Sequence, residues 1–264
     1  MTLTGDADLY RLGAELRAEI LGRERLEQAL RDEDDLDEYY HLFGHECCYA
    51  QVWSRPGLSR LDRALVTFSM IAALGPQSVT LGVHVRGVIR SGGTRAQLSQ
   101  ILAMITWYAG VPVGSQATAT VRAALIKIPE PEAQVRGPAQ PVVSSSELAA
   151  RGSALRRLVL GEPQPTGLSD METAHQRMQE THFFGVLWSN TDLSLKQRCL
   201  VLLGVICGSN RMEDMQEWFA AALRLGYKVE ELEEVVFSAS AYCGQLTYAT
   251  ARKALIGAAI SQKA

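Results

Sequence analysis

The sequence lacks a C-x-x-C motif, and cysteine itself is scarce, with 5 residues in a chain of 264. An odd number of cysteines does not support a disulfide framework. Without C-x-x-C, the chain has neither the thiol pair of a redox protein nor the ligand spacing of a zinc knuckle. We therefore expect all of them to pack as small apolar side chains: Cys47, Cys48, Cys199, Cys207 and Cys243.

Strong net charge and long apolar segments are also missing. The formal net charge is -3 at pH 7, which is too small to indicate a nucleic-acid-binding surface. The longest apolar run, ALVTFSMIAALG, is too short to span a bilayer. The opening MTLTGDADLY does not have the basic-then-apolar order of a signal peptide. These absences predict a cytoplasmic protein that binds neither nucleic acid nor membrane.

The chain does contain an internal repeat. The segment RLGAELRAEILG in the first half is matched by ARGSALRRLVLG in the second. A second pair, VWSRPGLSRLDRALV and LWSNTDLSLKQRCLV, aligns Trp53 with Trp188. A third pair aligns Tyr108 with Tyr242 at nearly the same spacing along the chain. The repeat predicts two tandem copies of one structural unit.

Each copy has the pattern of helices. Ser59, followed by Asp62 three residues on, predicts a capped helix start. Thr94 and Gln97 predict the start of another helix, directly after a Gly-Gly pair. The apolar positions of the helix after Ser59 share one stripe: Leu61, Leu65, Phe68 and Ala72. No alternating strand with a hairpin turn is found, so the predicted fold class is all-α.

A segment rich in Pro, Ser and Gly, IPEPEAQVRGPAQPVVSSS, separates the copies and is typical of a linker. We expect a first domain over residues 1–127, a linker over 128–146 and a second, diverged domain over 147–264. Copied apolar faces are self-complementary, so the two domains are expected to dock as a pseudo-dimer with a pocket at their junction.

Taken together, RLGAELRAEILG, VWSRPGLSRLDRALV, HVRGVIRSGGTRAQLSQIL and WYAGVP resemble the carboxymuconolactone decarboxylase family in its tandem form. The resemblance implies the all-helical alkylhydroperoxidase D-like fold and assembly into trimers or hexamers, with tandem chains in place of dimers. It also implies chemistry without a cofactor on a carboxylated lactone or a similar oxygenated ring. Thiol peroxidases of this superfamily carry C-x-x-C before a helical histidine, and Gln77 and Thr80 stand at those two positions here. Peroxidase activity is therefore not expected.

The same resemblance points to His84 and Glu46 as catalytic residues. His84 matches the helical histidine of the family, and an imidazole suits proton transfer at neutral pH. Glu46 resembles a family glutamate, and a carboxylate on an apolar helix would have a raised pKa. The second copy has Trp218 and Thr181 at these positions, so only the first copy is predicted to be active. The alternatives are a core histidine bonded to a carbonyl and a glutamate paired with an arginine.

Further residues are candidates for contacting the substrate. A guanidinium can hold a carboxylate by two hydrogen bonds, which favours Arg63. The duplication of Arg63 as Arg198 equally favours a structural role, such as bonding helix-end carbonyls or a buried acid. Arg55 is aligned with Asn190 in the second copy, and this difference between the copies favours a role for Arg55 in the site. The residues predicted to contact the substrate are Arg63, Arg55, Trp53, His45 and Tyr108.

The acidic positions after the glycine turn differ between the copies. Where family members commonly have acidic residues, the first copy has Gln97 and Gln100, whereas the second keeps Glu231 and Glu234. We interpret these positions as exposed or interfacial. The difference indicates a specialised descendant of the family.

His41 and His45 are four residues apart and can share one helical face, as in some metal sites. Two ligands do not complete a site, so we predict neither a metal nor a cofactor. The function that we predict is a lyase, decarboxylase-like, acting on a carboxylated lactone, a keto acid or a polycyclic natural-product intermediate. We expect a biosynthetic tailoring enzyme with a small-molecule substrate, assembled as a homo-oligomer, namely a trimer of tandem chains. The alternatives are a non-catalytic helical binding or assembly protein and a metal-dependent oxygenase using His41 and His45.

Overall fold

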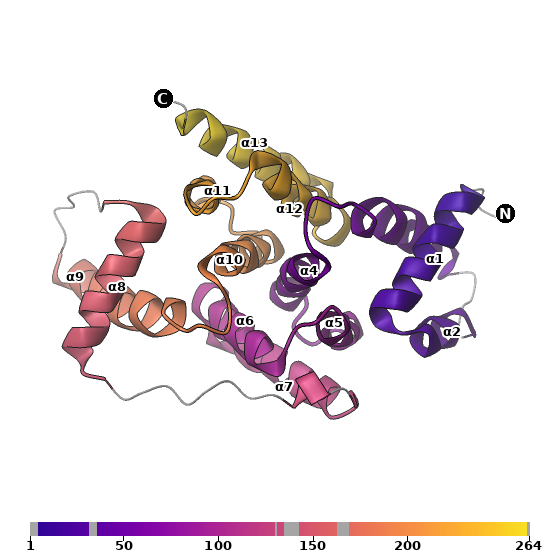
Figure 1. Cartoon of the computed structure of the whole chain (residues 1–264), viewed down its shortest axis with the longest axis horizontal. Coiled ribbons are helices and arrows are strands. Elements are labelled where there is room, and N and C mark those ends of the chain that lie inside the picture. The colour runs from indigo at the N-terminus through magenta and orange to yellow at the C-terminus, as the bar shows by residue number, and fades with distance from the viewer. Residues whose placement is uncertain (1–4, 32–35, 130, 135–142, 163–168, 263–264) are drawn as a thin grey trace.

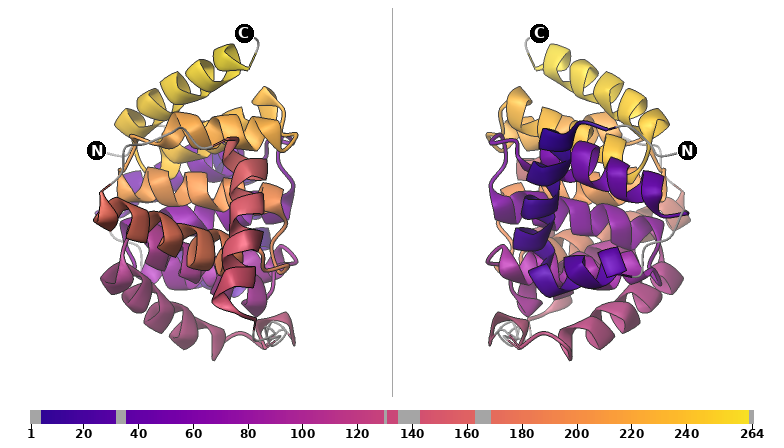
Figure 2. Two further views of the ribbon diagram at one scale, coloured as in Figure 1. Left: turned by 90° about the vertical axis from the view of Figure 1, so that its left-hand side faces the viewer. Right: turned by 90° about the vertical axis from the view of Figure 1, so that its right-hand side faces the viewer.

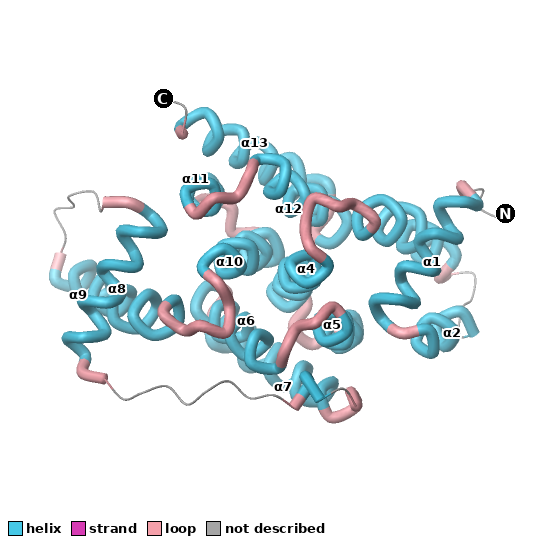
Figure 3. Tube along the Cα trace, viewed as in Figure 1, coloured by secondary structure: helices cyan, strands magenta, loops and turns pink. Residues whose placement is uncertain are grey.

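The computed structural model of the chain describes residues 5–31, 36–129, 131–134, 143–162 and 169–262. Within these ranges every regular element is a helix and no strand occurs (Figure 3). The first half contains α1 (Ala7–Leu21), α2 (Arg23–Arg31), α3 (Glu38–Phe43), η1 (Gly44–Trp53), α4 (Arg60–Leu74), α5 (Val79–Arg90), α6 (Arg95–Tyr108), α7 (Val111–Leu125) and η2 (Pro131–Ala133). The second half contains α8 (Ser145–Leu160), α9 (Asp170–Met178), η3 (Gln179–Trp188), α10 (Leu195–Ser209), α11 (Met215–Arg224), α12 (Val229–Tyr242) and α13 (Gln245–Ser261).

The two halves repeat the same order of helices. The π-helices η1 and η3 are both 10 residues long, and they start at aligned positions of the repeat, Gly44 and Gln179. Helices α4 to α7 correspond in the same way to α10 to α13. The predicted all-α tandem fold is therefore confirmed.

The helix starts follow from capping side chains. The Ser59 hydroxyl accepts a hydrogen bond from the Asp62 amide at 3.0 Å, which satisfies one of the free N–H groups at the start of α4. Thr94 and Gln97 form a reciprocal capping box at the start of α6. Both starts lie where the sequence predicts them.

Copied glycines explain why the first helices of the two halves, α1 and α8, have similar sequences. A Cβ added to Gly13 would lie 1.8 Å from the carbonyl oxygen of His45, and one added to Gly152 would lie 1.7 Å from that of Glu180. Only glycine allows α1 to pass this close to η1, and α8 to η3. The repeat at this point therefore preserves a backbone-to-backbone contact.

The halves pack around a central pair of helices, α4 and α10 (Figure 1). Helices α1 and α8 stand across the helix layers on opposite sides of the molecule (Figure 2). Helix α12 of the second half packs on η1 and α4 of the first half, and α6 of the first half packs reciprocally on η3 and α10. The predicted pseudo-dimer is thus present, and each half supplies a helix to the centre of the other.

The predicted linker over 128–146 falls partly outside the described residues, which omit 135–142. Helix α8 begins at Ser145, behind a capping box formed by Ser144 and Glu147. No helix in the described part of the chain has both the length and the apolar character that a membrane span requires.

Candidate functional site

A cavity of about 340 Å³ lies between α1, η1 and α5 of the first half and the end of α12 from the second. This volume falls within the usual range for small-molecule sites, roughly 300–1,000 Å³. We call it the His84 cavity. Its lining includes two cations, Arg17 and Arg25, and no carboxylate from the described residues. An anionic ligand is therefore favoured electrostatically.

His84 lies on α5 and is 5% exposed. Its ring meets the ring of Tyr242 edge to face, with the centroids 5.6 Å apart. Burial, and then the positive charge of Arg17, lower the pKa of His84 to about 4. The imidazole is therefore neutral at pH 7, with one nitrogen carrying a proton and the other able to accept one.

Tyr242 brings a hydroxyl from the second half into the cavity. Its oxygen accepts a hydrogen bond from Trp53 Nε1 at 2.7 Å and another from Cys48 Sγ at 3.0 Å. Burial raises the pKa of Tyr242 well above its usual value, so the phenol keeps its proton at neutral pH. Because the oxygen already accepts two hydrogen bonds, its own O–H is available to a ligand.

Arg17 is held in place by two histidines. Its Nη1 lies 3.2 Å from Nδ1 of His41 and 3.1 Å from Nε2 of His45. A guanidinium only donates, so the facing ring nitrogen of each imidazole accepts. Burial, and then the positive charge of Arg17, lower the pKa of His45 to about 4.

This arrangement bears on the predicted alternative of a metal site at His41 and His45. One ring nitrogen of each histidine faces the guanidinium of Arg17, which would repel a metal cation there. The described residues hold no group of three or more side chains suited to binding a metal ion. His45 instead positions Arg17, and it does not line the His84 cavity.

Arg63 and Arg55 do not line the His84 cavity either. Arg63 Nη2 donates to Glu234 Oε2 at 2.9 Å and to the carbonyl of Arg55 at 2.8 Å. Arg55 Nε donates to both carboxylate oxygens of Glu234, at 2.9 and 3.0 Å. Glu234 is 3% exposed and Arg63 1%. Both arginines are thus engaged in joining the two halves, which is the structural alternative raised for Arg63.

Glu46 is not brought together with His84. Its carboxylate lies against Gly5 and Leu42, so closely that a Cβ at Gly5 would overlap Oε1. Oε1 is buried and has no hydrogen-bond partner among the described residues. The side chain is absent from the lining of the His84 cavity. The structure thus does not bring the carboxyl group of Glu46 and the imidazole of His84 into one cavity, and a catalytic role of Glu46 stays a prediction.

Tyr108 and Trp53 also stand outside the lining. Trp53 Nε1 donates a hydrogen bond to the hydroxyl of Tyr242. Tyr108 belongs to the corresponding centre of the second half, where its ring lies 5.2 Å from Phe183 and 6.1 Å from Trp218. Of these four cavity-lining residues, the sequence predicts a functional role for His84 but not for Arg17, Cys48 or Tyr242. Arg17 and Tyr242 do lie in the repeated segments, which was the available signal.

Comparison with known proteins agrees with this arrangement. The model of the carboxymuconolactone decarboxylase family matches residues 43–123 and 173–256. The chain is 33% identical over 112 residues to 4-carboxymuconolactone decarboxylase of Acinetobacter baylyi, covering 42% of this chain and 83% of the relative. It is 32% identical over 105 residues to nitrosuccinic acid decarboxylase npaB of Metarhizium robertsii, covering 39% of this chain and 72% of that relative. The chain therefore belongs to the carboxymuconolactone decarboxylase family, as a tandem two-domain member without the C-x-x-C motif.

Proposed function

We propose that this protein is a lyase that needs no cofactor and decarboxylates a small carboxylated substrate in the His84 cavity. The observation that carries the proposal is the cavity itself, which combines two cations, a neutral imidazole and a protonated phenol. The names of the two relatives, both decarboxylases, support the same reaction class.

In this reaction the bond between the substrate carbon and the departing carboxylate breaks, and carbon dioxide leaves. The electron pair stays on the substrate and spreads onto an adjacent carbonyl oxygen as an enolate. The neutral N–H of His84 donates a hydrogen bond to that oxygen, and Arg17 holds a second, non-reacting carboxylate. Groups placed to meet charge that develops in the transition state account for most of such a rate.

Tyr242 supplies the proton that replaces carbon dioxide on the substrate carbon. The phenolate left behind keeps its hydrogen bond from Trp53 Nε1, which stabilises it until solvent returns the proton. In this proposal Tyr242 takes the proton-transfer role that was predicted for His84 and Glu46, and His84 acts as a hydrogen-bond donor.

The test is release of carbon dioxide and product formation, followed by NMR, with 4-carboxymuconolactone and nitrosuccinate as probes. We expect turnover with the wild type, and a loss of about 10²- to 10⁴-fold for His84→Ala. Tyr108→Phe, the matched change in the second half, should stay within about twofold of the wild type. A folded His84→Ala protein with full turnover would refute the mechanism. Tight binding without turnover would favour the non-catalytic binding alternative.

We further propose that the chain assembles with copies of itself, as a trimer of tandem chains. The corresponding helices α7 and α13, with Ile126 directly after α7, present large apolar side chains to solvent: Val111 is 69%, Ile126 79%, Leu246 87% and Ile260 64% exposed. Large apolar side chains exposed on corresponding helices of both halves favour association with further copies of the chain. Sedimentation equilibrium should give three times the chain mass of 28.9 kDa, and a monomer would contradict the proposal.

A further inference from the structure

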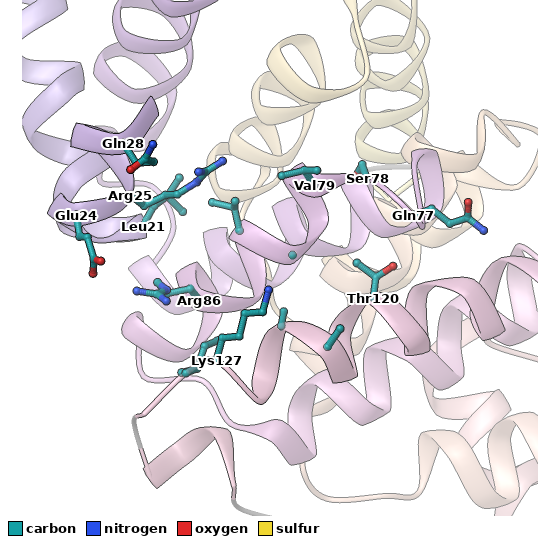
Figure 4. Close-up of a pocket in the computed structure, with 15 residues that line it drawn as sticks. Leu21, Glu24, Arg25, Gln28, Gln77, Ser78, Val79, Arg86, Thr120 and Lys127 are labelled. Atoms are coloured by element: carbon teal, nitrogen blue, oxygen red, sulfur yellow. The ribbon is translucent and has the colours of Figure 1, made fainter. Parts of the chain in front are cut away.

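A second and larger hollow, of about 650 Å³, lies beside the His84 cavity (Figure 4). We call it the outer chamber. Small residues of α5 and α7, namely Gly82, Ala123 and Ala124, form part of its lining, and α2 contributes another part. A Cβ added to Gly82 would meet nothing closer than Ala124, at 3.9 Å, so the space next to this glycine is open.

The outer chamber is lined by three cations from three separate elements: Arg25 of α2, Arg86 of α5 and Lys127, just after α7. Figure 4 shows Lys127 reaching from the end of α7 toward α5, with Arg86 nearby and Arg25 across from them on α2. Glu24 is the one carboxylate in the lining that the structure describes. None of the three cations forms an ion pair with a described carboxylate. The chamber is therefore a concave surface with uncompensated positive charge.

The outer chamber and the His84 cavity are adjacent and share part of their lining. Both are lined by Leu21, Arg25, Ser78, Val79 and Val83. A ligand that extends from one space into the other would pass these shared residues, among them Arg25.

The helical bundle itself does not require these cations. At the aligned positions of the second half, Ala220 stands in the place of Arg86 and Ser261 in that of Lys127. The same helices thus fold with neutral residues in their place. Of the two halves, the one that contains His84 is the one with positive charge at these two positions.

We infer that the outer chamber is a second subsite, which binds an anionic group, carboxylate or phosphate, at the far end of an extended substrate. Arg86 and Lys127 hold this group while the reacting carboxylate lies in the His84 cavity. The inference rests on the proposed function for the identity of the ligand as a substrate. It adds a requirement, because the substrate must carry an anionic group remote from the carbon that loses carbon dioxide.

The test is calorimetric titration of the full chain with two probes, citrate for carboxylates and inorganic pyrophosphate for phosphates. We expect one site per chain and an affinity at least about tenfold weaker in Arg86→Gln/Lys127→Gln, because each charged hydrogen bond contributes roughly a factor of ten. The probe that binds more tightly identifies the anionic group. A matched double variant, Arg151→Gln/Lys253→Gln, removes two exposed cations elsewhere and should bind within about twofold of the wild type.

A second variant fills the space without changing charge. Gly82→Leu places a side chain in the outer chamber and should weaken binding of the preferred probe by at least about tenfold while the protein remains folded. Equal weakening in both double variants would show unspecific charge attraction and would overturn the inference. Absence of probe binding to the wild type would overturn it as well.

The two proposals fail in different ways. If Arg17→Gln abolishes probe binding and Arg86→Gln/Lys127→Gln does not, the anion lies in the His84 cavity, and the inference fails while the proposed function stands. If the chamber variants behave as expected but no carboxylated probe loses carbon dioxide, the proposed function fails and the anion subsite remains.

Discussion

The two halves share one scaffold but have different centres. In the first half, His84, Cys48 and the hydroxyl of Tyr242 surround a cavity. The corresponding positions of the second half are Trp218, Phe183 and Tyr108. There the rings of Trp218 and Trp188 stack with centroids 5.4 Å apart, and Phe183 lies 5.1 Å from Trp107. Aromatic rings thus fill in one half the place where polar groups stand in the other.

The contacts that join the halves differ in the same way. Glu234 gives Arg63 a buried anionic partner. Arg198, which is 0% exposed, donates instead to neutral oxygens, namely Gln100 Oε1 at 3.4 Å, the carbonyl of Asn190 at 2.5 Å and Asn190 Oδ1 at 3.3 Å. Burial therefore lowers the pKa of Arg198 to about 10. The comparison teaches that backbone contacts and caps preserve the fold in both halves, while a few exchanged side chains determine the charge and chemistry of each centre.

The largest expected effect is on catalysis. His84→Ala should lower kcat by about 10²- to 10⁴-fold, because the enolate loses a preorganised hydrogen-bond donor. Trp218→Phe, at the matched position, should leave kcat within about twofold. Comparable losses of kcat in both variants would show that the centre of the second half also takes part in catalysis, which would contradict the assignment of activity to the first half.

The next effect is on stability. Arg63→Ala leaves the carboxylate of Glu234 buried with Arg55 as its remaining charged partner, and should lower the free energy of unfolding by about 3–5 kcal/mol. Arg198→Ala leaves no anion behind and should cost less. Urea unfolding of both variants measures the difference, and an equal loss would contradict the asymmetry.

The pH dependence should come from the first half. The unfolded chain binds a proton at His84 with a pKa near 6.5 and the folded chain with a pKa of about 4, so the unfolded state binds more protons between these values. Stability is therefore fully present above pH 6.5 and falls as the pH drops toward 4, by on the order of 3 kcal/mol from this group. Urea unfolding at pH 7, 5.5 and 4.5 measures the slope. His84→Phe should reduce the slope without abolishing it, because His45, whose pKa is also lowered to about 4, contributes in the same direction. An unchanged slope would contradict the buried neutral state of His84.

A smaller effect separates the two tyrosines. Tyr242→Phe should lower kcat by about 10- to 100-fold, since the proton donor is lost and water must replace it. Tyr108→Phe should have no effect on kcat. If Tyr242→Phe raised KM alone, the hydroxyl would be a binding group instead of a proton donor.

The smallest effect tests whether the halves can be made alike. Gln100→Glu offers Arg198 the carboxylate that Arg63 already has, and should raise the free energy of unfolding by about 1 kcal/mol. Thermal and urea unfolding measure it. A destabilised variant would indicate that desolvation of the new carboxylate outweighs its attraction to Arg198.

Much of the fold could be predicted from the sequence because its determinants are local or repeated. Ser59 and Thr94 cap helices through neighbours three residues away, and the repeat itself predicts that the halves dock. The partners within the site could not be predicted in this way. Arg63 meets Glu234 at a separation of 171 residues, and Tyr242 reaches the cavity from the other half. Glu46 was predicted from a resemblance, which gives the position of a residue along the chain but not the direction of its side chain, and here that side chain lies on the π-helix η1 outside the cavity lining.

The joining of both copies in one chain has a consequence for what mutation can achieve. In a dimer of identical subunits, every substitution changes two symmetry-related positions at once, so a histidine lost from one pocket is lost from the other. Here Trp218 could replace the imidazole in one copy while His84 remained in its counterpart. Covalent linkage thus allows one pocket to be filled by packed side chains while the corresponding pocket changes its chemistry independently.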